Sequence, residues 1–372
     1  MWLGLRVIRF ESVTKAYPDG TVAVGGLDLT VPDGRTTVLV GPSGCGKTTS
    51  LRMVNRMIEP TSGRIWVDDR DTATMDAAQL RRGMGYVIQQ AGLFPHRTVA
   101  DNIATVPRLL GWDRRKARER SLELLERVGL PADFAGRYPH QLSGGQQQRV
   151  GVARALAADP PVMLMDEPFS AVDPVVREQL QNEFLRLQSE LGKTILFVTH
   201  DIDEAVKLGD QVAVLRVGGV LAQVADPATL LGDPHDDFVA DFVGRDRGYR
   251  RLGFRDAPVL KPCEEPTVAL GASPEEVRRT GSDWVLVVDQ DRRPVGWVEP
   301  ARIQGPVDRT DLHRGGTVAR LEGSTRAVLD AALSSPSGRG VVVDEEGLVL
   351  GTVTAADVVA AIDAARESGE AG

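Results

Sequence analysis

The sequence predicts an α/β fold built around a phosphate-binding loop, and three observations lead to this class. The first is a glycine-rich run over residues 41–48 that fits the pattern GxxxxGK[ST]. The second is the alternation of short apolar runs with helical segments over residues 6–243. The third is a pair of carboxylates, Asp166 and Glu167, directly after the apolar run 162–165.

The loop has the flanking elements that phosphate binding requires. A strand is expected over residues 36–40 before it, and a helix over residues 47–57 after it. Glycine lacks a Cβ, so backbone N–H groups can turn towards the phosphates, while Lys47 meets the β and γ phosphates and Thr48 offers its hydroxyl to Mg²⁺. A chance match is the alternative, which the order of strand, loop and helix disfavours. The nucleotide-binding residues expected here are Gly41, Ser43, Gly44, Cys45, Gly46, Lys47, Thr48 and Thr49.

Further strands and a helical insert follow the loop. The expected strands lie over residues 85–88, 162–165, 194–198 and 211–215. Between residues 95 and 160 the pattern becomes helical, with one helix expected over residues 114–128, so this stretch is interpreted as a helical insert.

Three polar residues at strand ends are the candidates for hydrolysis. Asp166 can reach Mg²⁺ through a water, and Glu167 is placed to take a proton from the attacking water. His200, after the strand 194–198, can hydrogen-bond the γ-phosphate. A strand-capping pair and a surface histidine are the structural alternatives, and the presence of a phosphate loop argues against both.

Composition limits the function classes. The chain has 372 residues, a net charge of −8 and no apolar run near the ~18 residues of a membrane helix, so we expect a cytosolic protein without a nucleic-acid partner. Its two cysteines, Cys45 and Cys263, indicate neither a disulfide framework nor a metal site. Cys45 is either a small buried residue or, at a helix start, a reactive thiol.

A second domain is expected over residues 266–372, after a linker rich in Arg, Gly and Pro over 245–265. This domain has a weak internal repeat in which two strands flank an acidic turn and a helical segment follows. The two copies are residues 284–298, followed by 300–303, and residues 340–353, followed by 355–364.

These motifs together resemble the ATP-binding subunit of ABC transporters over residues 6–243. The resemblance implies a P-loop NTPase core with a helical subdomain, in residues 1–244, and ATP hydrolysis with Mg²⁺. Tyr17 resembles the aromatic residue that stacks on adenine, or else it is a packing residue; Gln89 resembles the glutamine that touches Mg²⁺ and the attacking water. The family signature matches Ser143, Gly144, Gly145 and Gln146, and the loop that couples two sites matches residues 170–173, ending in Asp173.

In this family the signature completes the site of the opposite protomer, so the resemblance implies a homodimer that holds two ATP molecules at its interface. It also implies separate permease subunits, contacted around residues 89–96, and a peripheral location on the cytoplasmic face of the membrane. A periplasmic or lipid-anchored solute-binding protein belongs to such systems.

Two segments, residues 86–96 and 241–247, resemble subunits that drive uptake of quaternary amines such as glycine betaine, carnitine, choline or proline betaine. The tail resembles the paired CBS modules of those subunits, small α+β units. The likeness implies that Thr354 and Asp357 hold a nucleotide ribose, unless they only cap a helix. An adenine nucleotide, a cyclic dinucleotide and ionic strength all stay open as the regulatory signal.

Three other functions are alternatives to quaternary-amine uptake. The same subunit type serves importers of other small solutes, such as amino acids or polyamines. A soluble ABC protein that acts on ribosomes or DNA is disfavoured by the single phosphate loop and the acidic balance. A nucleotide-binding module with idle catalysis is disfavoured by the presence of Lys47, Asp166, Glu167 and His200.

Overall fold

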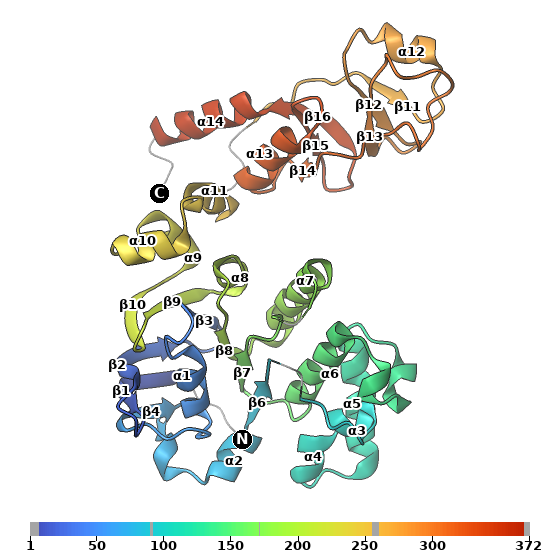
Figure 1. Cartoon of the computed structure of the whole chain (residues 1–372). Helices are drawn as coiled ribbons and strands as arrows, with labels where there is room; N and C mark the ends of the chain where they lie inside the picture. Colours follow the sequence, from blue (N-terminus) through green and yellow to red (C-terminus); the bar gives the residue numbers. More distant parts are fainter. Residues whose placement is uncertain (1–6, 90–91, 171, 255–259, 368–372) are drawn as a thin grey trace. The chain divides into compact units, whose positions relative to one another are not determined.

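The computed structural model of the protein describes residues 7–89, 92–170, 172–254 and 260–367. The chain divides into two compact units, Met1–Gly244 and Arg245–Gly372. Each unit has its own sheets, helices and hydrophobic core (Figure 1). In the part of the chain that the structure describes, no helix is both long and apolar enough to span a bilayer.

A six-stranded sheet forms the centre of the first unit, in the order β10-β9-β3-β8-β7-β6. Its strands are β3 (Thr36–Val40), β6 (Met84–Val87), β7 (Val162–Asp166), β8 (Thr194–Val198), β9 (Gln211–Arg216) and β10 (Val220–Ala225). Neighbours run parallel except β10, which is antiparallel to β9. Every residue of β3, β7 and β8 is buried, as expected for a parallel sheet covered on both faces. The strands expected from apolar runs all form, with ends shifted by one residue at most.

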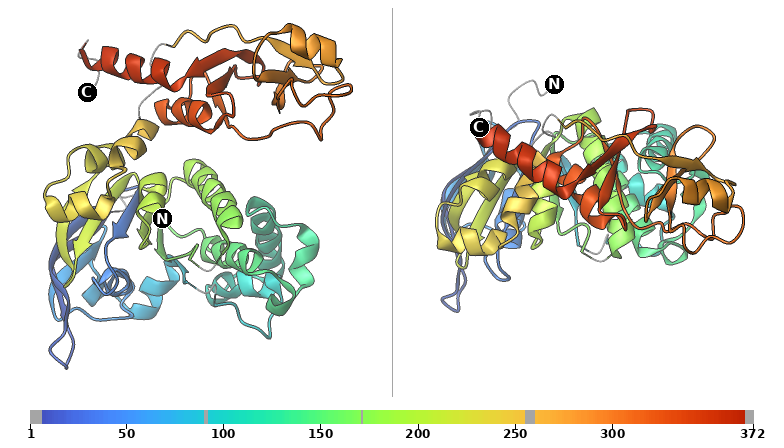
Figure 2. Two further views of the ribbon diagram at one scale, coloured as in Figure 1. Left: turned by 45° about the horizontal axis from the view of Figure 1, so that its top comes forward. Right: turned by 90° about the horizontal axis from the view of Figure 1, so that it is seen from above.

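A second, antiparallel sheet has the order β2-β1-β4-β5 and was not predicted as a separate layer. Its strands are β1 (Ile8–Ala16), β2 (Val22–Val31), β4 (Ser62–Val67) and β5 (Arg70–Asp71). The dark-blue hairpin of β1 and β2 reaches the edge of the unit in Figure 2. The register of β1 breaks near Ser12, which has φ 47° and donates its N–H to Asp28 Oδ1 at 2.7 Å. This irregularity interrupts the alternation that reveals a strand in a sequence.

Helices flank both sheets. They are η1 (Thr72–Thr74), α1 (Lys47–Val54), α2 (Ala77–Arg82), α7 (Pro174–Leu191), α8 (Ile202–Leu208), α9 (Pro227–Gly232) and α10 (Asp237–Val243). The predicted helix 47–57 ends three residues early, because Arg56 is left-handed at φ 54° and the N–H groups of Met57 and Ile58 turn back to Arg52 O. Aspartate caps begin six of these helices: Asp71, Asp76, Asp173, Asp201, Asp226 and Asp236.

The helical insert lies beside β6 and forms a subdomain, drawn in teal and green in Figure 1. Its helices are α3 (Val99–Ile103), α4 (Thr105–Leu109), α5 (Arg114–Arg127), η2 (Ala132–Gly136), η3 (Pro139–Gln141) and α6 (Gly144–Leu156). Helix α6 begins at Gly144, inside the predicted signature 143–146. Ser143 and Gln146 form a reciprocal capping box, which places both intervening glycines in the first turn.

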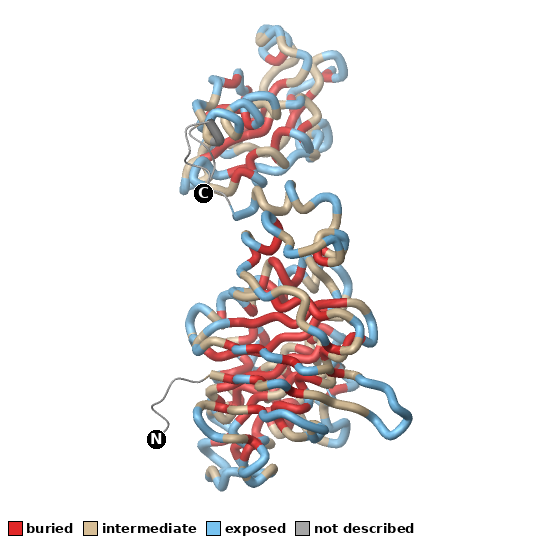
Figure 3. The backbone as a smooth tube through the Cα atoms, turned by 90° about the vertical axis from the view of Figure 1, so that its left-hand side faces the viewer, coloured by how far each residue is buried: buried red, intermediate tan, exposed pale blue. Residues whose placement is uncertain are grey.

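The central sheet separates two cores. Alternate residues of its strands point to opposite faces, so Val38 and Met165 belong to the core under the helical subdomain and α7. Leu39 and Leu164 belong to the core between the two sheets, around α1. Figure 3 shows these buried strand segments in red, at the centre of the unit.

The second unit contains the internal repeat. The first copy has β11 (Thr267–Ala269), α12 (Pro274–Arg279), β12 (Val285–Val288) and β13 (Pro294–Val298). The second has β14 (Val318–Arg320), α13 (Thr325–Ser334), β15 (Arg339–Val343), β16 (Val349–Thr354) and α14 (Ala355–Glu367). In both sheets the first two strands are parallel and the last two antiparallel. Two bridges, Cys263 with Thr352 and Trp297 with His313, occupy equivalent places in the copies. The repeat therefore includes a leading strand and helix that the sequence analysis missed.

One expectation about this unit was wrong. Residues 300–303 do not continue into a helix: they form a turn in which Arg302 N–H bonds Glu299 O at 3.0 Å. Pro306 and Gly305 follow closely and disfavour a longer helix. The stretch 245–265, expected as a linker, contains two short helices, α11 (Arg247–Arg251) and η4 (Leu252–Phe254). Residues 255–259 of that stretch lie outside the described residues.

Candidate nucleotide site

The glycine-rich loop connects β3 to α1 in a conformation that needs glycine. Gly41 has φ 155°, and a Cβ there would lie 2.3 Å from Leu215 O. Gly46 has φ 93°, and its Cβ would lie 2.1 Å from Ala23 O. Both positions are closed to any side chain, so the loop keeps its backbone close to neighbouring strands.

Lys47 is the first residue of α1 and is largely buried. Its ammonium donates to Gly41 O at 2.8 Å and to Pro42 O at 3.0 Å. The positive charge is thereby held inside the curve of the loop. Cys45 is fully buried beside it, and burial raises the pKa of the Cys45 thiol. Of the two interpretations of Cys45, the structure favours the small buried residue over the reactive thiol.

Asp166 ends β7 next to the loop. Thr48 Oγ1 donates to Asp166 Oδ1 at 2.8 Å, and Arg52 Nη2 lies 3.5 Å from Asp166 Oδ2. The carboxylate is almost completely buried and both its oxygens have partners. It is a fixed acceptor on the side of the loop where Thr48 emerges.

Glu167 follows with φ 45°, an uncommon conformation for a residue with a side chain. Its N–H bonds Val198 O at 3.0 Å, and its carbonyl accepts from Ser170 Oγ at 3.0 Å. Its carboxylate oxygen Oε2 lies 3.1 Å from His200 Nδ1 and accepts from Gln89 Nε2 at 3.4 Å. Three predicted residues from three strand ends therefore meet at one oxygen atom.

A cavity of about 610 Å³ opens over the loop. It is lined by Ala23, Gly41, Pro42, Ser43, Gly44, Cys45, Gly46, Lys47, Thr48, Thr49, Glu167, His200 and Phe242. All the residues expected from the glycine-rich loop line it, together with Glu167 and His200. Asp166 and Gln89 do not line the cavity, but they form hydrogen bonds with the lining residues Thr48 and Glu167.

Phe242 was missed as a site residue. It lies in α10, stacks on Phe238 with ring centroids 6.2 Å apart, and contributes an aromatic side chain to the cavity. In the sequence, residues 241–247 point only to a likeness to quaternary-amine uptake subunits. No local pattern shows that this segment returns to the loop, because the two are separated by some two hundred residues of chain.

Several predicted residues lie away from the cavity of this chain. Tyr17 is 37% exposed and contacts Lys15, whose Nζ lies 5.4 Å from the ring centroid. Residues 143–146 form the start of α6, where Ser143 and Gly144 are exposed and Gly145 is buried, and Asp173 caps α7 by accepting Val176 N–H at 3.1 Å. Of the described residues that line the cavity, none comes from these segments. Gln90, Ala91 and Ala171, which belong to the predicted motifs, lie outside the described residues.

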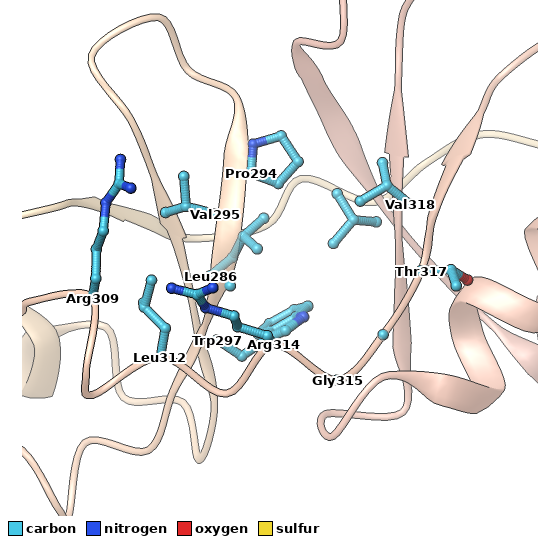
Figure 4. A pocket seen from close by; sticks show the side chains of 13 residues that line it. Leu286, Pro294, Val295, Trp297, Arg309, Leu312, Arg314, Gly315, Thr317 and Val318 are labelled. Atoms are coloured by element: carbon cyan, nitrogen blue, oxygen red, sulfur yellow. The ribbon is translucent and has the colours of Figure 1, made fainter. Parts of the chain in front are cut away.

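A second cavity, of about 330 Å³, lies in the tail between the two copies of the repeat (Figure 4). Its walls are β13 residues from Pro294 to Trp297 and the segment before β14. The side chains of Arg309 and Arg314 stand at its rim, and neither forms an ion pair with a carboxylate among the described residues. The cavity combines an apolar wall with two available positive charges.

Thr354 and Asp357 do not line this cavity. Asp357 Oδ2 accepts Thr354 N–H at 2.9 Å and Thr354 Oγ1 at 2.6 Å, and Asp357 N–H returns to Thr354 Oγ1. These bonds lower the pKa of Asp357. The pair caps α14, as the structural alternative expected.

Glu265 and Arg339 join the two copies. Arg339 forms two bonds of 2.9 Å to the Glu265 carboxylate and a third, of 3.1 Å, to Trp284 O. Thr352 Oγ1 donates to the same carboxylate at 2.8 Å. Glu265 is nearly fully buried, so this cluster fixes the start of the tail against both copies.

Comparison with known proteins adds three findings. A family model described as ABC transporter matches residues 24–170. The osmoprotectant import ATP-binding protein OsmV of Salmonella typhimurium is 44% identical over 94% of this chain and 94% of its own length. The glycine betaine/carnitine/choline transport ATP-binding protein OpuCA of Bacillus subtilis is 42% identical over 95% of each.

A solved structure agrees with the fold of the first unit. It is the dimeric post-hydrolysis state of the ATP-binding cassette MJ0796 bound to ADP and Pi, with 34% sequence identity and a TM-score of 0.53. The match covers 59% of this chain and 98% of that one. The remaining part of this chain, which holds the repeat, lies beyond the cassette.

Proposed function

We propose, from the premise that this chain belongs to the ABC transporter family as an ATP-binding subunit, that it hydrolyses ATP to drive uptake of a quaternary amine such as glycine betaine. The observation that carries this proposal is the likeness to two importer subunits over almost their whole length, tail included. Substrate does not touch such a subunit, so its identity rests on this likeness and not on contact chemistry.

The cavity over the loop supports a mechanism for hydrolysis. Lys47 and the loop N–H groups neutralise and orient the phosphates, and α1 directs its positive end at them. A water attacks the γ-phosphorus and transfers its proton to Glu167, while the bond to the ADP oxygen breaks. His200 and Gln89 hold the Glu167 carboxylate. In this proposal His200 also contacts the γ-phosphate and Gln89 the attacking water.

The residues beside the loop fit Mg²⁺. Thr48, Asp166 and Gln89 offer hydroxyl, carboxylate and amide oxygens, the donors that this cation prefers. Among the described residues no group of three or more His, Cys, Asp and Glu could hold a metal alone, in keeping with a site in which phosphates and water supply further ligands. When bound, Mg²⁺ would neutralise charge that develops on the phosphates.

The proposed working unit is a dimer. Residues 143–146 form a helix start at which Ser143 and Gly144 are exposed, and none of these residues lines the cavity of the same chain. In a pair of chains each signature would face the ATP held by the other, with Asp173 linking the two sites. ATP would close the pair and hydrolysis would open it.

The other partners follow from the family. The subunit would sit on the cytoplasmic face of the membrane against permease subunits, contacted by the region around residues 89–96. A solute-binding protein would deliver the amine. The alternatives to this proposal are import of another small solute and a role outside transport.

The test is uptake into proteoliposomes that contain the chain, its permease and its solute-binding protein. Labelled glycine betaine should enter with ATP supplied on the side of this subunit, and Glu167→Gln should abolish entry. Entry of a labelled amino acid or polyamine but not of any quaternary amine would overturn the substrate. Association with ribosomes in place of a permease would overturn transport itself.

We also propose that the tail binds a regulatory nucleotide. The support is the cleft between the copies, where Arg309 and Arg314 offer positive charge beside an apolar wall. This favours an anionic ligand, an adenine nucleotide or a cyclic dinucleotide, over a response to ionic strength alone. Thr354 and Asp357 remain candidates for a ribose contact through their exposed cap.

Binding can be measured on the full chain carrying Lys47→Ala, which weakens the loop site. Labelled ATP, AMP and a cyclic dinucleotide are titrated, then repeated with Arg309→Ala and Arg314→Ala together. Saturable binding that the double substitution weakens at least about tenfold supports the cleft. No saturable binding, or binding lost only with Thr354→Ala, contradicts it.

A further inference from the structure

A network of buried polar side chains lies beneath the proposed catalytic groups. Glu167 and His200 follow different strands, β7 and β8, yet their side chains approach to 3.1 Å. Neither backbone segment is part of a regular element at that point. The bond from Glu167 N–H to Val198 O, 3.0 Å long, holds the two strand ends together. The helices that follow these ends, α7 and α8, add side-chain contacts that hold the segments beyond them.

Helix α7 holds the segment that follows Glu167. Arg177 donates from Nε to Phe169 O at 3.3 Å and from Nη2 to Val172 O at 3.2 Å. The Phe169 ring packs on Phe184 of the same helix and on Phe197 of β8. The position of this segment is thus set by α7.

Helix α8 holds the segment around His200. Asp201 caps the helix by accepting the N–H of Asp203 at 2.8 Å, and its own N–H bonds Thr199 Oγ1 at 3.0 Å. Glu204, 6% exposed, is a buried residue of α8, and its N–H bonds Asp201 Oδ1 at 3.3 Å. Burial raises the pKa of Glu204, and Thr199 and Gln181 oppose that rise.

One hydrogen bond connects the two helices at this level. Gln181 Nε2 donates to Glu204 Oε1 at 3.1 Å, and both side chains are buried. Gln181 stands one helical turn after Arg177, so the two lie on one face of α7. A continuous path of contacts leads from Thr199 through Asp201, Glu204, Gln181 and α7 to the carbonyl groups of Phe169 and Val172.

We propose that Glu204, Gln181 and Arg177 are positioning residues that hold Glu167 and His200 in register for hydrolysis. The inference rests on the proposed roles of Glu167 and His200. It assigns a task to a buried carboxylate that touches neither nucleotide nor metal. A misplaced base slows the chemical step and leaves nucleotide binding nearly intact, since the loop that binds phosphate is untouched.

The test compares two substitutions on the same helix in the full chain. Gln181→Leu removes the donor to Glu204. Gln188→Leu is the matched control, because Gln188 also bonds carbonyl groups, Gly34 O at 3.1 Å and Lys193 O at 2.7 Å, but at the opposite end of the strands. Gln181→Leu loses a buried hydrogen bond and Gln188→Leu loses two part-buried ones, so both variants should unfold at a lower temperature.

Gln181→Leu should lower kcat for ATP about tenfold with KM changed less than about twofold, whereas Gln188→Leu should keep kcat. Glu204→Gln, which retains an acceptor for Gln181, should keep most of the activity. Equal kcat values for Gln181→Leu and Gln188→Leu, or a fall in Glu204→Gln as large as in Gln181→Leu, would overturn the inference. Wild-type chain and Glu167→Gln are assayed in parallel: turnover that does not depend on Glu167 would count against the proposed function instead.

Discussion

His200 Nδ1 lies 3.1 Å from Glu167 Oε2, so the two side chains proposed to act in hydrolysis contact each other directly. Gln89 shares that oxygen at 3.4 Å. The contact orients the carboxylate and leaves its other oxygen for a water. An imidazole that donates through Nδ1 also keeps Nε2 for a partner of its own.

Glu167→Gln should lower ATP turnover at least a hundredfold, about 2.7 kcal/mol of barrier, because an amide cannot accept the proton of the attacking water. The isosteric change keeps the nucleotide bound, so an ATP-loaded dimer should accumulate. Phosphate release and light scattering with size-exclusion chromatography measure the two effects. Normal turnover would remove Glu167 from its role.

Gly46→Ala should destabilise the first unit by about 3 kcal/mol, since its φ of 93° and the 2.1 Å approach to Ala23 O leave no room for a methyl group. Gly44→Ala is the control in the same loop. Its φ is 75° but no atom lies within 4 Å, so only conformational strain of about 1 kcal/mol is expected. Urea denaturation should rank the two variants in this order.

Phe242→Ala should weaken ATP binding about fivefold, roughly 1 kcal/mol, through the loss of apolar contact at the cavity wall. Tyr17→Ala tests the adenine contact that the family resemblance implies. Phe254→Ala, an exposed position of the second unit, serves as the control. Each of the three substitutions is combined with Glu167→Gln, and titration with a fluorescent ATP analogue measures its affinity. An unchanged affinity for Phe242→Ala would assign that ring to packing alone.

The difference in stability between Glu204→Gln and the wild type should depend on pH. Burial raises the pKa of Glu204 above its ordinary value of 4.5, so the folded chain binds the proton more tightly than the unfolded chain. Its contribution to stability is therefore full below pH 4.5 and declines as pH rises through the raised pKa. The Tm of the variant minus that of the wild type should increase over this window and then level off. A difference independent of pH would show that Glu204 titrates normally.

Arg339→Met should destabilise the tail by about 3 kcal/mol, because it leaves the buried Glu265 carboxylate without its cation. Glu299→Gln, which breaks the exposed pair with Arg302, should change stability by less than about 0.5 kcal/mol. The measurement is denaturant unfolding followed by tryptophan fluorescence, in which the transition of the second unit should shift and that of the first should not. Equal effects of the two variants would contradict the buried role.

Much of the first unit could be predicted because its strands are buried on both faces. Continuous apolar runs such as β3 and β8 stand out in a sequence, and the loop between β3 and α1 has a fixed residue pattern. The antiparallel sheet was harder to predict, since β1 is half-buried and broken at Ser12. Its alternation is too irregular to recognise without its partners.

The missed site features depend on contacts that are distant in sequence. Phe242 reaches the loop only because α10 folds back over it, and Gln181 meets Glu204 only because α7 and α8 pack together. Thr354 and Asp357 illustrate the opposite case. Their local spacing fits both a helix cap and a ribose contact, and the hydrogen bonds of the structure are those of a cap.

The distance in sequence between the phosphate loop and the start of α6 has a genetic consequence. In the proposed dimer, a chain inactivated at Lys47 still presents an intact Ser143 to its neighbour, and a chain inactivated at Ser143 still has an intact loop. Two defective alleles, expressed together in one cell, should therefore rescue each other through mixed pairs that contain one sound site. Two copies of the same allele should not.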